Sequence, residues 1–361
     1  MFFFLKYSYI EPTTSEGSGG NRKMENIEVT FYLDPVAHKN LQKDRKLFHM
    51  SPKETILIKR IIVNHYPKYN QETKELHDRI KDSFKDQASQ PLIEDAVWQI
   101  TKYISENSID KSISTKEKRI KDKIHFRVNN NENQLECVLD ACPVNVSRSE
   151  FIANIIYSYL NNPQYERERI VFKEELKQLE DAIKNNQAIK IKSKYDRTHN
   201  SDFQIIYPKE VCFSNEELFN YLLYKKIIKG KECARSIHLY NIDTIFTLPE
   251  NCTFSKELLN RFKRMKRNGA QFTINHNTEF KIQFTEKGLE RYNTLNYLEK
   301  PVALDKSNEK TRIFYFDCSD MQFRNYFANF YDEMEVLEPK EMREHLLRLG
   351  QRMVDKYSKD I

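Results

Sequence analysis

The sequence predicts an α+β protein built from several domains, and three observations lead to this prediction. A chain of 361 residues is long enough for two or three domains, each with its own core. A strand, a helix and a capped helix occur in that order twice within the first 165 residues. Several short alternating strands follow, and a further region mixes strands with helices. We therefore expect a paired N-terminal unit, a small β-rich unit and a C-terminal α+β domain.

The composition is that of a folded protein with a mild bias toward polyanions. Hydrophobic residues make up 39% and charged residues 31% of the chain, which excludes a disordered protein. The 59 lysines and arginines exceed the 53 aspartates and glutamates, giving a net charge of +6. This excess does not by itself establish nucleic-acid binding. The six cysteines and nine histidines show no metal-binding spacing, so we expect no metal, no cofactor and a reduced, cytoplasmic protein.

The sequence also lacks the motifs of common enzyme classes and of membrane proteins. Its seven glycines form no phosphate-cradling loop, and HExxH and nucleophile-elbow motifs are missing, so we expect no catalytic activity. No apolar run approaches the roughly 18–20 residues of a membrane span, and we expect no membrane contact. Residues 1–23 contain the segment EGSGGN before Met24, and we expect a flexible leader or an upstream mis-start there.

The first structured segment is predicted to be a half-buried strand followed by two helices. Residues Ile27–Leu33 alternate between apolar and polar side chains, which is typical of a strand with one buried face. Asp34-Pro35 then provides an N-cap and a proline in the first helical turn. A capping box at Ser51–Glu54 opens a second helix, which we expect to end at Pro67.

The same order of elements recurs about a hundred residues later. Lys123–Asn129 alternates in the same way, a helix is predicted around Leu135–Leu139, and a capping box at Ser147–Glu150 opens another helix. This repeat over residues 24–165, with a helical insertion between the copies, resembles the ribbon-helix-helix family. A single copy cannot bury the apolar face of its strand, so we expect Ile27–Leu33 and Lys123–Asn129 to pair as an antiparallel ribbon.

The outward face of such a ribbon has the size that enters a DNA major groove. Its candidate nucleic-acid-binding residues are Thr30, Tyr32, His125, Arg127 and Asn129. Glu28 lies on the same face and would repel a phosphate backbone. The alternative interpretation is that these positions are merely solvated.

Residues 166–248 are predicted to form a small β-barrel. A charged helix leads into Ala188–Tyr195, an alternating strand with Lys190, Lys192 and Lys194 on one face. Further strand signals occur at Phe203–Tyr207, Phe219–Lys225 and Ser236–Asn241. Short strands at close, regular spacing favour a small closed or half-closed barrel.

Several residues of these strands resemble the WYL domain, an Sm-like (SH3-type) barrel of bacterial regulators. The resemblance is carried by Tyr195 in IKSKYD, by Pro208 after a strand, by Asn220-Tyr221-Leu222 and by ARSIHLYNIDTI, which ends at Ile245. The motif's tryptophan is Asn220 here, a frequent arginine is Gln204, and both arginines of the later strand are replaced within Ile237–Ile242. The resemblance implies recognition of a small ligand or nucleotide, and in place of the family's arginines His238 and the nearby Arg235 can donate to a phosphate or a base.

Aromatic rings flanked by lysines are how proteins commonly hold single-stranded nucleic acids. The candidate binding residues of this region are Lys192, Lys194, Tyr195, Tyr207, Tyr221, Arg235 and His238. The alternative is that the tyrosines belong to the core. A basic linker helix within residues 249–271 places five cations in Arg261–Arg267 and adds Arg264 and Arg267 to the candidates.

Residues 272–361 are predicted to form a compact α+β domain. Phe280–Phe284 and Arg312–Phe316 read as strands, each followed by a helix, and a last helix follows Pro339. This pattern matches the C-terminal extension often found after WYL domains. Because that extension commonly mediates dimerisation, the resemblance implies a homodimer.

The combination of domains resembles the WYL accessory proteins of type VI-D CRISPR-Cas loci. The resemblance implies a non-catalytic protein that binds single-stranded RNA and stimulates an RNA-guided ribonuclease effector. Single-stranded DNA is a second possible ligand of the barrel. The alternative function is a ligand-controlled, DNA-binding transcriptional regulator that acts through the ribbon.

Overall fold

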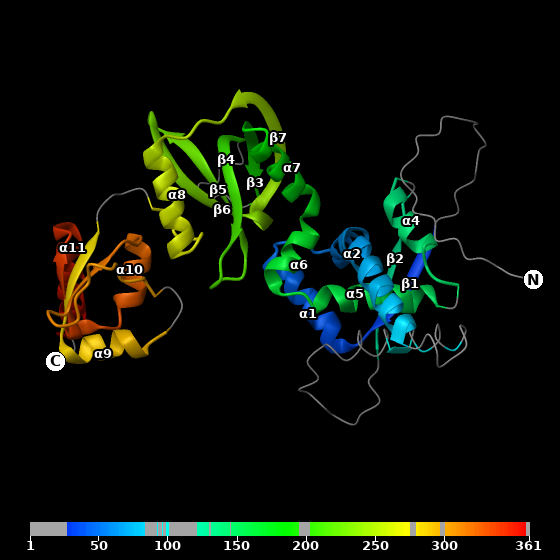
Figure 1. Cartoon of the computed structure of the whole chain (residues 1–361), viewed down its shortest axis with the longest axis horizontal. Coiled ribbons are helices and arrows are strands. Elements are labelled where there is room, and N and C mark those ends of the chain that lie inside the picture. The colour runs from blue at the N-terminus through cyan, green and yellow to red at the C-terminus, as the bar shows by residue number, and fades with distance from the viewer. Residues whose placement is uncertain are drawn as a thin grey trace, which may run out of the picture.

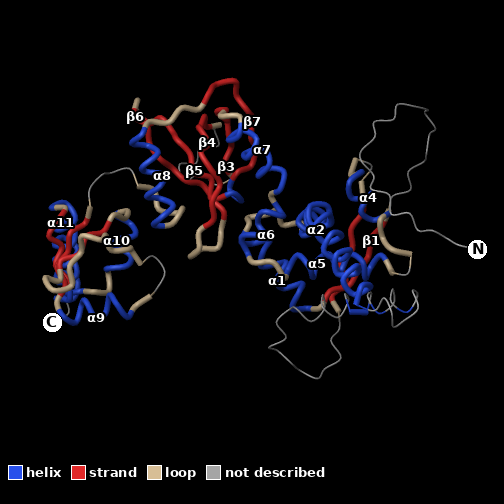
Figure 2. The backbone as a smooth tube through the Cα atoms, viewed as in Figure 1, coloured by secondary structure: helices blue, strands red, loops and turns tan. Residues whose placement is uncertain are grey.

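The computed structural model describes residues 27–83, 121–129, 131–144, 146–194, 203–274, 279–296 and 300–358, together with Leu92, Ala96, Gln99 and Ile100. The expected leader, most of the helical insertion and the candidate Tyr195 lie outside these residues. The described part of the chain is a mixed α+β protein with ten α-helices and three sheets. Figure 2 shows that helices predominate in the N-terminal part and that strands are concentrated in the middle of the molecule.

The N-terminal unit is built around a two-stranded antiparallel sheet. Its elements are β1 (Glu28–Leu33), α1 (Pro35–Leu47), α2 (Glu54–Ser83), β2 (Asp122–Arg127), α4 (Asn133–Asp140), α5 (Arg148–Leu160), α6 (Gln164–Val171) and α7 (Lys173–Lys184). In the register of β1 and β2, Thr30 lies opposite His125 and Phe31 lies opposite Ile124. The predicted antiparallel pairing of the two strands is confirmed (Figure 1).

Local sequence explains why these elements begin where they do. The Asp34 carboxylate accepts a hydrogen bond from the Val36 amide and caps α1, and the Ser147 hydroxyl accepts one from the Glu150 amide and caps α5. The apolar face of the ribbon, which includes the fully buried Phe31, packs into the core of the N-terminal unit. Burial of this face, which one strand could not achieve alone, stabilises the pair.

The prediction that Pro67 ends its helix is wrong. Pro67 lies inside α2, which continues to Ser83. A proline removes one helical hydrogen bond, but packing beyond it favours continuation. The Tyr69 ring is 5% exposed and meets the Phe151 ring of α5 edge to face, with centroids 6.4 Å apart.

The middle of the chain forms a five-stranded antiparallel sheet. Its elements are β3 (Gln187–Ser193), β4 (Gln204–Phe213), β5 (Asn220–Ile228), β6 (Lys231–His238), the 3-10 turn η1 (Leu239–Asn241) and β7 (Ile242–Asn251). The strand order is β6-β5-β4-β3-β7, so β6 and β7 are the two edges. The expected barrel is thus not closed, because the turn after β6 carries the chain across to pair β7 with β3 rather than with β6.

Two helices pack against this sheet on opposite sides (Figure 1). Leu179 of α7 shares a core with Ile189 and Ile191 of β3, and this core is continuous with that of the N-terminal unit. The basic linker helix is α8 (Lys256–Asn268), whose Phe262 packs with Tyr221 of β5. Gly269, with a φ of 113°, follows the last residue of α8, as expected of a helix stop.

The C-terminal region forms a separate α+β unit. Its elements are β8 (Phe280–Phe284), α9 (Glu286–Thr294), β9 (Ile313–Phe316), α10 (Asp320–Phe327), the 3-10 turn η2 (Tyr331–Glu333), β10 (Met334–Glu338) and α11 (Lys340–Tyr357). Its antiparallel sheet has the order β10-β8-β9 and an aromatic core in which the Phe280 and Phe323 rings are stacked, 4.1 Å apart. The two predicted strands are present, and β10 adds a third that the sequence analysis did not assign.

Candidate nucleic-acid interface

The outward face of β1 and β2 brings four of the five ribbon candidates together. Thr30 Oγ1 and His125 Nδ1 are hydrogen-bonded at 3.0 Å, and Tyr32 is 45% exposed two residues further along β1. Arg127 lies opposite Glu28 and pairs with its carboxylate at 2.8 Å. A phosphate would therefore have to compete with Glu28 for the Arg127 guanidinium.

The fifth ribbon candidate has a local structural role. Asn129 lies just past β2, and its backbone amide donates a hydrogen bond to the Glu132 carboxylate at 2.8 Å. Lys59 of α2 donates to the same carboxylate and also to the carbonyl of Arg127, at 2.6 Å. These contacts fix the end of the ribbon against α2, while the side chain of Asn129 remains exposed.

A pocket of about 490 Å³ lies beside the ribbon at the N-terminus of α5. It is lined by Tyr32, Lys121, Ser147, Ser149, Glu150, Ala153, Asn154 and Tyr157. The Asn154 side-chain nitrogen is buried and has no hydrogen-bond partner among the described residues. The helix N-terminus and Lys121 favour a negatively charged group here, whereas the Glu150 carboxylate opposes it. The spacing of the sequence predicts Ser147 only as the N-cap of a helix.

The lysines at positions 190, 192 and 194 do not share one face as the alternation predicts, and Lys194 lies just past the end of β3. The pairing of β3 with β7 shifts its register between Lys192 and Ser193, which turns the following residue to the other side of the sheet. The Lys194 ammonium consequently lies 4.5 Å from the centre of the Phe172 ring, and burial lowers the pKa of this lysine. Lys192 remains on the sheet face with Lys190.

The tyrosine candidates occupy two different environments. Tyr207 of β4 donates a hydrogen bond to Glu250 at 3.2 Å, and the Lys225 ammonium lies 4.4 Å from the centre of its ring. Tyr221 of β5 is 4% exposed and packs beneath α8, so neither face of its ring is open to a base in this arrangement. Burial raises the pKa of the Tyr221 hydroxyl, which donates to Glu217.

His238 belongs to an aromatic cluster at the end of β6. Its ring stacks on Tyr240 with centroids 4.5 Å apart, and its Nε2 lies 3.1 Å from the Tyr221 hydroxyl. Burial lowers the pKa of His238 to about 4, so the ring is neutral at pH 7 and is not a cation for a phosphate. Arg235 lies opposite Tyr224 in the pairing of β5 and β6 and is partly exposed.

The two arginine candidates of α8 converge on one carboxylate of the C-terminal region. Arg264 Nε donates to Asp317 Oδ1 at 2.6 Å, and Arg267 pairs with Oδ2 of the same residue. The Asn268 side chain also donates to the Asp317 carbonyl, at 2.7 Å. Arg264 is only 14% exposed, so its first role is to attach α8 to the segment between β9 and α10. A phosphate would have to compete with Asp317 for both guanidinium groups.

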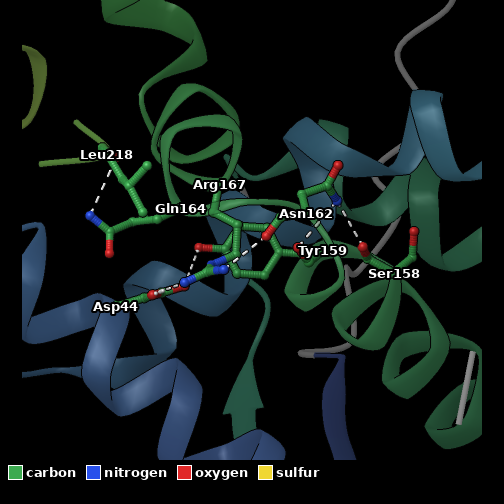
Figure 3. A network of polar contacts seen from close by, with 7 residues as sticks. All are labelled: Asp44, Ser158, Tyr159, Asn162, Gln164, Arg167 and Leu218. Atoms are coloured by element: carbon green, nitrogen blue, oxygen red, sulfur yellow. Dashed lines mark hydrogen bonds and ion pairs between the residues drawn. The ribbon is translucent and has the colours of Figure 1, made fainter. Parts of the chain in front are cut away.

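Helix α6 connects the ribbon unit to the five-stranded sheet through buried polar contacts. Arg167 pairs with Asp44 of α1, and the Tyr159 hydroxyl of α5 donates to the same carboxylate at 2.8 Å (Figure 3). Glu168, on the same helix, accepts hydrogen bonds from the Asn220 amide of β5 and from the Tyr240 amide. Asn220, the residue at which the sequence departs from the motif it resembles, thus binds a buried carboxylate.

Among the described residues, no group of histidine, cysteine, aspartate and glutamate side chains is arranged to hold a metal ion. None of the described helices is both long enough and apolar enough to cross a membrane.

The fold is that of a multidomain α+β protein, and it has a counterpart among solved structures. The chain is similar to a structure described as "Crystal structure of a CRISPR Cas-related protein", with 17% sequence identity, a TM-score of 0.57, and coverage of 96% of this chain and 97% of that one. Proteasome accessory factor B/C (PafBC) of Arthrobacter aurescens matches at 12% identity, covering 62% of this chain and 35% of that chain with a TM-score of 0.25, which is too low to support an argument. No protein-family model and no curated protein matches the chain.

Proposed function

We propose that this protein is a non-catalytic nucleic-acid-binding regulator that binds single-stranded RNA and modulates a type VI-D CRISPR RNA-guided ribonuclease. The observation that carries the proposal is the likeness in fold to a CRISPR Cas-related protein along nearly the whole length of both chains. A likeness confined to one common domain would say little about the role, since one fold serves many functions. Here the likeness covers 96% of this chain and 97% of that one.

The two domain families named in the sequence analysis are part of this proposal. The antiparallel pairing of β1 with β2, each followed by two helices, supports a ribbon-helix-helix unit formed within one chain. The five-stranded sheet, with Tyr221 and Leu222 buried in β5, supports a WYL-type module in an open form. A homodimer formed through the C-terminal region completes the proposed architecture.

The distribution of charge favours a single strand on the sheet over a duplex on the ribbon. On the outward face of the ribbon, Arg127 is paired with Glu28, which leaves Lys123 as the one exposed lysine of that face among the described residues. On the sheet, Lys190 and Lys192 lie on one face, and neither forms an ion pair with another described residue. Phosphate contacts supply most of the affinity of such proteins, so the uncompensated lysines are the better candidates.

A salt titration of binding tests the proposal. The full chain is titrated into labelled single-stranded RNA, single-stranded DNA and duplex DNA of matched sequence at several salt concentrations. We expect the tightest binding for single-stranded RNA, with the logarithm of the association constant falling by roughly 0.7 per neutralised phosphate for each unit of log salt. Failure to bind single-stranded RNA at low salt would refute the proposal. In a cleavage assay with a type VI-D effector, we expect added protein to change the rate of target-RNA cleavage.

A ligand-controlled, DNA-binding transcriptional regulator is the second candidate. It is favoured by the ribbon, on which Thr30, Tyr32 and His125 form an exposed polar face on two paired strands. A two-stranded ribbon has the dimensions of the major groove. If the protein preferred duplex DNA to both single strands in the same titration, the transcriptional regulator would be the better supported function.

A further inference from the structure

One half of the five-stranded sheet carries large apolar side chains on an open face. We define the β3–β4–β7 surface by Lys190 and Lys192 of β3, Phe203 immediately before β4, Ile205 at the start of β4, and Phe246 of β7. Phe203, Ile205 and Phe246 are 41%, 47% and 52% exposed. The Phe203 and Phe246 ring centroids are 5.5 Å apart, and the Lys190 ammonium lies 5.0 Å from the centre of the Phe203 ring.

The strand register explains how residues from distant parts of the sequence form this surface. Lys190 lies opposite Ile205 on one side and opposite Phe246 on the other, so the three side chains form a row across three adjacent strands. Lys192 lies opposite Thr244, one row further along the same face. The surface therefore gathers two neighbouring rings and two lysines on one face of the sheet.

Packing elsewhere on the sheet shows that this surface is not needed for the core. The other face of β3 is buried, since Ile189 and Ile191 are fully covered on the side of α7. On the same face as the surface, α8 covers only the half formed by β5 and β6, where Phe262 contacts Tyr221. Among the described helices, none covers the β3–β4–β7 half on this face, since α7 packs on the opposite one. Apolar side chains that are exposed side by side often mark a surface at which another molecule binds.

The chemistry of the surface suits a single-stranded nucleic acid. Phenylalanine faces stack with bases of any sequence, and lysines beside the rings pair with the phosphates that connect those bases. The two lysines have no carboxylate partner among the described residues, while Glu250, at the Tyr207 end, is held by that tyrosine. A purely apolar partner would gain nothing from lysines beside the rings. A duplex would keep its base faces stacked and out of reach.

We propose that the β3–β4–β7 surface is the site that binds single-stranded nucleic acid, with Phe203 and Phe246 stacking on bases and Lys190 and Lys192 neutralising phosphates. This inference rests on the proposed function and specifies its site. It differs from the sequence-based assignment, because the stacking rings are two phenylalanines rather than Tyr195, Tyr207 and Tyr221.

The test measures binding of the full chain to a fluorescein-labelled oligouridylate and oligothymidylate of about 15 nucleotides. Phe203→Ala and Phe246→Ala are each expected to weaken binding at least fivefold, as removal of a stacking ring costs about 1–3 kcal/mol and 1.4 kcal/mol is a tenfold change. The slope against salt should hardly change. Lys190→Ala with Lys192→Ala should flatten the slope by roughly one unit or more.

Phe213→Ala is the matched control. Phe213 lies at the other end of β4, is 45% exposed and stacks on Tyr165 with centroids 4.7 Å apart. Its removal should leave binding unchanged. If an alanine variant loses the circular-dichroism spectrum of the parent, Phe203→Leu and Phe246→Leu keep the apolar bulk without the ring and should show the same loss of affinity.

The outcomes separate the two levels of the proposal. If the parent protein binds neither oligonucleotide, the proposed function fails, and the site with it. If the parent binds but folded Phe203 and Phe246 variants bind equally well, the site is wrong while the function stands. Loss of binding in these variants, with Phe213→Ala unaffected, supports the assignment.

Discussion

The Arg167 guanidinium on α6 binds the Asp44 carboxylate on α1 through two hydrogen bonds, of 2.7 and 2.8 Å (Figure 3). Asp44 is completely buried, and Tyr159 donates a third hydrogen bond to it. Arg167 also donates to the carbonyl of Asn162. This one ion pair joins the first helix of the ribbon unit to the helix that contacts the five-stranded sheet.

We predict that Arg167→Met strongly destabilises the protein. The substitution leaves the buried carboxylate of Asp44 without its cation, which typically costs about 3–5 kcal/mol. Urea unfolding, followed by circular dichroism, measures the free energy of unfolding. Arg127→Ala is the control, because its pair with Glu28 is exposed and is expected to contribute less than about 1 kcal/mol. If the two variants lost the same free energy of unfolding, the conclusion that the buried Arg167–Asp44 pair stabilises the protein more than the exposed pair would be contradicted.

Glu168 is expected to make stability depend on pH. Burial raises the pKa of this carboxyl from 4.5 to about 7, although the hydrogen bonds from Asn220 and Tyr240 oppose that shift. The folded state therefore binds a proton more tightly than the unfolded state, and the contribution of Glu168 to stability falls as pH rises from about 4.5 to 7. Burial lowers the pKa of His65 and of His238 to about 4, so both histidines act in the opposite direction below pH 6.5.

The contribution of Glu168 to the pH dependence of stability can be separated from that of the two histidines by comparing the parent with Glu168→Gln. The difference in unfolding free energy between the two proteins should change by up to about 3 kcal/mol between pH 4.5 and 7, in favour of the variant at the higher pH. Urea unfolding at several pH values provides the measurement. A difference that does not vary with pH would show that Glu168 keeps an ordinary pKa.

The ribbon and the sheet should respond differently to Arg127→Ala. If the ribbon contacts duplex DNA, removal of this exposed guanidinium weakens duplex binding and reduces its salt slope by about one unit. Single-stranded RNA binding should be unchanged, since Arg127 lies on β2, outside the β3–β4–β7 surface. Fluorescence anisotropy measures the affinity of the parent and the variant for duplex DNA and for single-stranded RNA. A loss of single-stranded RNA affinity would place the ribbon within that site.

The proposed homodimer should depend on α11. This helix exposes five large apolar side chains to solvent, namely Leu347, Leu349, Met353, Val354 and Tyr357. Apolar surface of this kind is unfavourable in water unless a partner covers it. We expect light scattering at micromolar concentration to give about twice the 43.3 kDa of one chain. Leu349→Glu with Met353→Glu should return the monomer mass, whereas Val302→Glu, at a similarly exposed site outside α11, should not. A monomeric parent would contradict the prediction.

The sequence predicted those features that depend on local periodicity. The pairing of Ile27–Leu33 with Lys123–Asn129 followed from alternation, because the burial of one strand face imposes a period of two. Lys194 was misplaced because a register shift after Lys192 cannot be seen in the spacing of residues. The burial of Tyr221 could not be predicted from local spacing, because the Phe262 side chain that packs with it lies some forty positions later in the sequence. The exposure of Phe246 could not be predicted either, because it depends on the position of β7 at the edge of the sheet.

The most direct measurement is ultraviolet crosslinking of the full chain to a photoreactive single-stranded RNA, with the crosslinked peptides mapped by mass spectrometry. We predict crosslinks in β3, at the start of β4 and in β7, around Phe203 and Phe246. Excess unlabelled single strand should remove them, and excess duplex DNA should not. Crosslinks confined to β1 and β2, or none at all, would contradict the conclusion that the five-stranded sheet binds single-stranded nucleic acid.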